Sequence, residues 1–229
     1  MEWLDCMERE FFADDLHKRL TEFLKGKGIL DGDDPDKWER LFECTREWRG
    51  KYMKNSEELS LNSYFAWNIS VTAAEFEIPE AVLEDPDIMP DIMKELFLAV
   101  WLLDIDSDEE EKRCICKSGF EFEFECDLQY PKEKCARLTG EQLSKELRKI
   151  YNKSYDSLRR YKKDKGHNPE FVEWVEPNYP ALMRYIEEFE RNEGIEAVRL
   201  NKFDDCDRYV WYIAKNGGRI TFLQISDFA

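Results

Sequence analysis

The chain has 229 residues, of which 42% are hydrophobic and 14% aromatic, so it can build a core of its own and is not a disordered chain. Its 51 acidic and 34 basic residues give a net charge of −17, which opposes general attraction to nucleic acid and to anionic membranes. Seven cysteines scattered along the chain are typical of reduced thiols. The acidic first residues do not resemble a targeting segment, so we expect a cytoplasmic protein.

The first half of the chain is predicted to contain helices and one long strand. Apolar residues at helical spacing predict a helix over 2–25 and another over 38–52, with Asp34-Pro35 as the N-cap and the first-turn proline of the second. A period of two then predicts a strand over 64–78. An apolar helix that ends near Leu103 follows, and it is shorter than the roughly 20 residues that span a bilayer.

The second half is predicted to contain a hairpin, a long helix, two shorter helices and three strands. Thr139 and Gln142 match a capping box at the start of the long helix, and Asn216-Gly217 is typical of a hairpin turn. These elements lie, in the same order, over 114–128, 139–165, 168 onward, 182–189, 197–203, 209–214 and 219–226. The pattern predicts an α+β fold, an antiparallel sheet of about six strands packed with about five helices. We expect a single domain over 1–229, with a sub-boundary near 131–138 as the alternative.

Most of the negative charge lies in one stretch of sequence. Residues 61–130 carry 18 acids and 4 bases, whereas residues 131–168 carry 5 acids and 12 bases. The acids that we expect to face outward, on a loop and on one face of the predicted hairpin, are Asp104, Asp106, Asp108, Glu109, Glu110, Glu111, Glu121, Glu123 and Glu125. A solvated surface explains such charges without any partner. Gathered like charges also repel one another, and a basic partner relieves that repulsion.

The sequence therefore favours a non-enzymatic acidic binding protein of the inhibitor or immunity type. Such a protein occupies a basic surface of a partner protein, for example a nucleic-acid-binding enzyme, by imitating the charge of nucleic acid. The partner and the oligomeric state stay open. Glycine-rich phosphate loops and the common catalytic motifs are absent from the sequence, so we expect no cofactor, and an enzyme is the less favoured class.

Three alternatives remain. The basic helix 145–165 mixes bases with tyrosines and could bind RNA through Lys149, Lys153, Arg159, Arg160 and Lys163, although the same bases could pair with the protein's own acidic stretch. The cluster Asp104–Asp108, with Glu110 and Lys112, could hold a divalent metal for an enzyme that acts on nucleic acid. Zinc would use the four thiols of Cys114, Cys116, Cys126 and Cys135, but the C-x-C spacing is unusual for such a site.

Overall fold

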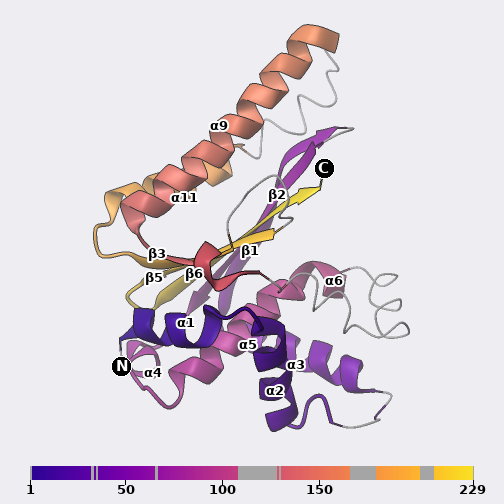
Figure 1. Ribbon diagram of the computed structural model, residues 1–229, viewed down its shortest axis with the longest axis vertical. Helices are drawn as coiled ribbons and strands as arrows, with labels where there is room; N and C mark the ends of the chain where they lie inside the picture. The colour runs from indigo at the N-terminus through magenta and orange to yellow at the C-terminus, as the bar shows by residue number, and fades with distance from the viewer. Residues whose placement is uncertain are drawn as a thin grey trace. The chain divides into compact units, whose positions relative to one another are not determined.

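The chain forms two compact units (Figure 1). Unit 1 comprises Met1–Lys54 and Phe76–Cys135, and unit 2 comprises Asn55–Glu75 and Ala136–Ala229. The computed structural model describes residues 2–31, 34, 36–64, 67–107, 128, 130–165, 179–201 and 209–228. One boundary between the units lies between Cys135 and Ala136, within the segment 131–138 where the sequence placed an alternative boundary.

Unit 1 is mainly helical in its described residues and also holds one end of β1 and one end of β2. Its apolar centre is α5, in which each residue from Leu96 to Val100 is fully buried. This burial explains why the stretch 96–100 is hydrophobic on all sides of the helix. The helices of unit 1 are α1 (Trp3–Phe11), α2 (Leu16–Gly26), α3 (Lys37–Tyr52), α4 (Glu80–Leu83), α5 (Met89–Trp101) and α6 (Leu103–Ser107), followed by the short 3₁₀ helix η1 (Lys132–Lys134).

The single helix predicted over 2–25 is wrong, because the chain breaks between α1 and α2. Phe11 and Leu16 are both fully buried on either side of the break. A helix turns by about 100° per residue, so one continuous helix would place these two side chains about 140° apart around its axis. The break lets each helix turn its own apolar stripe inward. The carboxylate of Asp14, at the break, accepts a hydrogen bond from the backbone N–H of Lys132 at 2.7 Å.

Unit 2 contains most of a six-stranded antiparallel sheet, in the order β1-β2-β6-β5-β4-β3. Two helices pack against each other beside it, α9 (Gly140–Lys165) and α11 (Tyr179–Arg191). The α+β fold predicted from the sequence is thereby confirmed. The strands are β1 (Met53–Tyr64), β2 (Trp67–Glu77), β3 (Ala136–Thr139), β4 (Glu196–Leu200), β5 (Tyr209–Asn216) and β6 (Arg219–Phe228).

The core of unit 2 lies between its two helices and the sheet. Leu143 and Leu147 of α9 and Leu182 and Ile186 of α11 are fully buried in one cluster with apolar residues of the strands. This arrangement follows from the helical spacing of these leucines, which places them on one face of each helix. The unit is thus a sheet with one helix-covered apolar face.

Local signals in unit 2 are confirmed where the structure describes them. The backbone N–H of Thr139 donates to the Gln142 side chain at 2.9 Å, and the Gln142 N–H donates to the Thr139 hydroxyl at 3.3 Å, which completes the capping box. Gly217 has a φ of 58° in the turn between β5 and β6. Two strands, β1 and β3, were not predicted. The predicted hairpin over 114–128, apart from Leu128, and the helix at Asn168 lie outside the described residues.

Within the described part of the chain, no helix is both long and apolar enough to cross a bilayer.

Candidate functional site

The two units differ in charge. By sequence, unit 1 has 32 acidic and 17 basic residues, a net charge of −15, whereas unit 2 has 19 and 17, a net charge of −2. Nearly all of the protein's excess negative charge therefore belongs to unit 1. Any site that works through negative charge is to be sought there first.

Asp106, a member of the predicted acidic surface, is already paired inside unit 1. Its carboxylate accepts hydrogen bonds from Arg46 at 3.0 to 3.2 Å and from Arg49, both on α3. Burial alone would raise the pKa of Asp106, but the hydrogen bonds and charges of the two arginines outweigh it and hold the pKa below its ordinary value. These hydrogen bonds link α6 to α3, and Asp106, with a side chain only 9% exposed, offers little surface to a partner.

The other members of the predicted surface are not described in atomic detail. Asp104 lies on α6, but its side chain is outside the described residues. The remaining acids, Asp108–Glu111 together with Glu121, Glu123 and Glu125, lie in the segment 108–127, also outside the described residues. Their part in binding stays a prediction.

An acidic row on α3 was missed by the sequence analysis. Glu39, Glu43 and Glu47 follow one another at intervals of four residues, which places them on one face of the helix, and all three are exposed. We call these three residues the acidic row. The signal was present in the sequence as an i, i+4, i+8 repeat, but it lies outside the stretch 61–130 where the charge excess is largest.

Two members of the acidic row, Glu43 and Glu47, form no direct ion pair with the bases on α3. Arg40 pairs with Asp34, and the hydrogen bonds of Arg46 and Arg49 to carboxylates go to Asp106. Among the described residues, no ion pair within 4 Å involves Glu43 or Glu47. The charge of Arg46 nevertheless acts on Glu39 and Glu43, so the helix compensates the row only in part.

The acidic row raises the pKa of the thiol of Cys44, which lies next to Glu43 in the sequence. Its thiol is half-buried, and burial is the main cause of its raised pKa; the charges of Glu47 and then Glu43 raise the pKa further. A thiolate is a negative charge, so nearby carboxylates disfavour it. Glu43 and Glu47 thus disfavour the thiolate form of Cys44.

Other bases of unit 1 also contact acids within the unit. Lys27, the residue after α2, lies 3.0 Å from Asp91 and 3.3 Å from Glu95, and Lys94 lies 2.8 Å from Glu10. Burial raises the pKa of Glu95 in spite of the neighbouring Lys27. These contacts join α1 and α2 to α5. They pair bases of unit 1 with acids of the same unit.

The basic helix predicted over 145–165 is α9, and the pairing of its charges is described for its first half. Arg148 lies 2.7 Å from Glu190 of α11, and Lys145 lies 2.6 Å from Glu141. Lys149 and Lys153 are exposed. The side chains of Arg159, Arg160 and Lys163 lie outside the described residues. The described ion pairs of α9 are made within unit 2.

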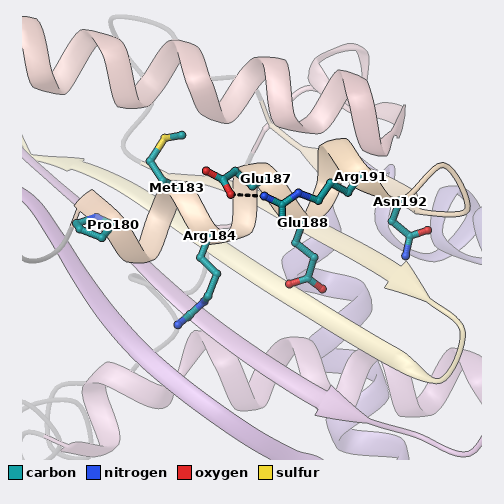
Figure 2. Close-up of a pocket in the computed structure, with 7 residues that line it drawn as sticks. All are labelled: Pro180, Met183, Arg184, Glu187, Glu188, Arg191 and Asn192. Atoms are coloured by element: carbon teal, nitrogen blue, oxygen red, sulfur yellow. Dashed lines mark hydrogen bonds and ion pairs between the residues drawn. The ribbon is translucent and has the colours of Figure 1, made fainter.

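A groove of about 680 Å³ runs along α11, lined by Pro180, Met183, Arg184, Glu187, Glu188, Arg191 and Asn192 (Figure 2). Figure 2 shows Met183 and Glu187 on one side of the helix and Arg184 and Glu188 on the other. Each charged residue of the lining has an oppositely charged partner: Glu187 with Arg191, Arg184 with Glu57, and Glu188 with Arg219. The groove therefore offers no uncompensated charge that would select a class of ligand.

The described residues include only one of the four cysteines of the zinc alternative. Cys114, Cys116 and Cys126 lie outside them, and Cys135 is half-buried and forms no disulfide. In the part of the chain that the structure describes, no group of three or more histidine, cysteine or acidic side chains is arranged to hold a metal ion.

Comparison of the chain with protein-family models, with curated proteins and with solved structures finds no significant match.

Proposed function

We propose that this protein is a non-enzymatic acidic binding protein, of the inhibitor or immunity type, which occupies a basic surface of a partner protein. Unit 1 supplies the binding surface, through the acidic row and the acids predicted at 108–111 and 121–125. The observation that carries the proposal is the segregation of charge: −15 in unit 1 against −2 in unit 2. Asp106 is left out of the binding surface because its charge is paired within the unit.

The acidic row is unfavourable for the helix that carries it. Like charges four residues apart on a helix cost about 0.2–0.5 kcal/mol per pair, and Glu39–Glu43 and Glu43–Glu47 are two such pairs. A solvated surface tolerates a cost of this size, so the row alone does not require a partner. A basic partner would remove the cost and would also be attracted over long range, which raises the association rate at low salt.

A titration with a basic peptide tests the proposal. The probe is a fluorescently labelled peptide of twelve lysines, and its anisotropy is followed at about 20 mM and 150 mM salt, where screening differs strongly. We expect binding at low salt that weakens steeply as salt rises. Failure of the parent protein to bind at low salt, or tighter binding of a single-stranded RNA of equal length, would overturn the proposal.

A pair of matched variants locates the surface. Glu47→Gln removes one exposed charge from the acidic row, and Glu193→Gln removes one exposed charge from unit 2; no ion pair is described for either residue. We expect the first variant to lose about twofold to fivefold in affinity and to show a lower salt dependence, since each close charge contributes a fraction of a kcal/mol to about one. Equal losses in both variants would exclude the acidic row as the contact.

The predicted part of the surface is tested in the same way. Charge reversal of Glu121, Glu123 and Glu125 to lysine is expected to weaken peptide binding and its salt dependence, and unchanged binding would exclude those residues. An affinity purification from the source lysate, eluted with salt, would then identify the natural partner. One stoichiometric basic protein in the eluate is the expected result.

A further inference from the structure

The turn between β5 and β6 contains the one asparagine of the chain that is followed by glycine. Asn216 is the last residue of β5 and pairs with Arg219, the first residue of β6, so Gly217 and Gly218 alone form the loop. Gly217 has a φ of 58°, and a left-handed glycine at the first of two central positions is typical of a type II′ turn. Gly217 is exposed and Asn216 is half-buried, so water reaches the tip of this hairpin.

The side-chain amide of Asn216 is not held by a hydrogen bond. Two other asparagines of unit 2 are held: Oδ1 of Asn192 accepts from the N–H of Gly194 at 3.1 Å, and Nδ2 of Asn201 donates to the carbonyl of Tyr209 at 2.8 Å. Among the described residues, no such partner is found for Asn216. Its side chain can therefore turn toward its own backbone.

The backbone N–H of Gly217 is also not engaged in the ladder. In a two-residue hairpin the closing pair exchanges both of its backbone hydrogen bonds, and here that pair is Asn216 and Arg219. In the part of the chain that the structure describes, no backbone acceptor is found for the N–H of Gly217. Glycine has no Cβ that would restrict the approach of another group to its nitrogen. A bond between this nitrogen and Cγ of Asn216 would close a five-membered ring.

We propose that Asn216 is a site of spontaneous deamidation, in which the backbone nitrogen of Gly217 is the attacking group. That nitrogen loses its proton and forms a bond to Cγ of Asn216, and the side-chain nitrogen takes up a proton and leaves as ammonia. One water molecule then opens the succinimide ring at either of its two carbonyl carbons. One opening gives aspartate, and the other gives isoaspartate, in which the side-chain methylene has entered the main chain. The sum is the hydrolysis of one amide to a carboxylic acid and ammonia.

The position of Asn216 at the end of its strand makes the necessary movement inexpensive. In a strand the next backbone nitrogen points away from the side chain, so Asn216 must rotate about its Cα–C bond before Gly217 can attack. This rotation opens only the closing pair with Arg219 and leaves the rest of the ladder intact. Such local openings at chain turns cost far less than global unfolding. By contrast, the exposed Asn152 lies within α9, where the helix binds the N–H of the following residue.

Deamidation would change both the charge and the connectivity of the hairpin. The new carboxylate would follow Lys215, which lies 3.4 Å from Glu196, and would lie opposite Arg219, which lies 2.8 Å from both Glu75 and Glu188. Isoaspartate would add a methylene to a loop whose length sets the register of β5 and β6. We expect the modification to loosen this end of the hairpin. It belongs to unit 2 and does not depend on the function proposed for unit 1.

Peptide mapping of the full chain tests the inference. The purified protein is incubated at mildly alkaline pH, digested under mildly acidic conditions, and analysed by mass spectrometry after chromatography that separates aspartate from isoaspartate. We expect the Asn216 peptide to convert at least tenfold faster than the peptides of Asn55 and Asn152, with isoaspartate among its products. Retention of the Asn216 amide in the native protein, while the same chain converts in urea, would overturn the inference. Aspartate as the sole product would indicate direct hydrolysis by water and would overturn the attack by Gly217.

Two glycine variants supply a matched test in the protein itself. Gly217→Ala places a Cβ beside the attacking nitrogen, whereas Gly218→Ala leaves the Asn216-Gly217 pair unchanged. We expect Gly217→Ala to convert at least tenfold more slowly than the parent, and Gly218→Ala to convert within about twofold of it. Alanine is strained at the left-handed position of Gly217, so the rates of parent and variant are also compared in urea, where the turn is absent. Equal conversion of Asn216 in the parent and in Gly217→Ala would contradict the inference.

Discussion

Substitution of Gly140 by alanine should destabilise unit 2, although alanine is the better helix former. Gly140 is the first residue of α9 and is buried against the end of α11. A Cβ there would lie 2.6 Å from the carbonyl oxygen of Phe189 and 3.0 Å from that of Asn192. The first distance is about 0.8 Å inside an ordinary contact of 3.4 Å, and both oxygens are backbone atoms that cannot rotate away.

The expected magnitude follows from two opposing effects. Overpacking of this kind costs about 1–3 kcal/mol, and we expect the upper half of that range because backbone must move. Alanine stabilises by about 0.4–1 kcal/mol, since it restricts the unfolded chain. The net expectation is a loss of about 1–2 kcal/mol. Gly50→Ala in α3 is the matched control: nothing lies within 4 Å of its Cβ, so we expect a gain of about 0.5–1 kcal/mol.

Urea unfolding followed by circular dichroism and tryptophan fluorescence measures both variants. With an m value of about 2 kcal/mol per molar urea, the two midpoints should move in opposite directions and separate by about 1 M. The two substitutions lie in different units, so each is compared with the parent transition that reports its own unit. A Gly140→Ala protein as stable as the parent would refute the close approach of α9 to the end of α11.

Two further predictions concern unit 1. Asp106→Asn should lower its stability by about 1–3 kcal/mol at pH 7, because the half-buried Arg49 loses its carboxylate partner. The pKa of Asp106 is lowered on folding. The contribution of its charge to stability is therefore complete above the unfolded pKa of about 4 and is lost as the pH falls through the lower folded value. A difference in urea midpoint between parent and variant that is the same at pH 3 and at pH 7 would contradict this prediction. Glu47→Gln should lower the pKa of Cys44 and speed its alkylation by iodoacetamide at pH 8 about twofold, measured on the Cys44 peptide by mass spectrometry. Glu22→Gln on α2 is the control. If Cys44 is alkylated at the same rate in the parent and in the Glu47→Gln variant, the acidic row does not act on this thiol.

The ion pairs of the two units explain why total charge is a poor guide to the working surface. Asp106 belongs to the most acidic stretch of the sequence, yet its two partners, Arg46 and Arg49, come from a helix some 60 residues earlier. A carboxylate with so little exposed surface, bound by two guanidinium groups, contributes to stability and is not offered to solvent. Glu43 and Glu47 lie in a less acidic stretch, but their charge is exposed.

Local chemistry was sufficient to predict the elements that depend on neighbouring residues. The capping box of Thr139 and Gln142 and the apolar stripe that follows predicted α9, and Asn216-Gly217 predicted the turn between β5 and β6, because each signal acts over a few residues. Composition and charge likewise established an acidic chain with its own core, and the order of the predicted elements indicated an α+β fold.

Only the tertiary structure decided the features that depend on distant partners. β1 has a polar sequence with little alternation, and it is a strand because β2 pairs with it and because Tyr185 and Arg184 hold Glu57. The break after Phe11 arises because two apolar stripes must reach one core. The free energy of these features comes from contacts between residues far apart in the sequence, so periodicity within a short window carries no record of them.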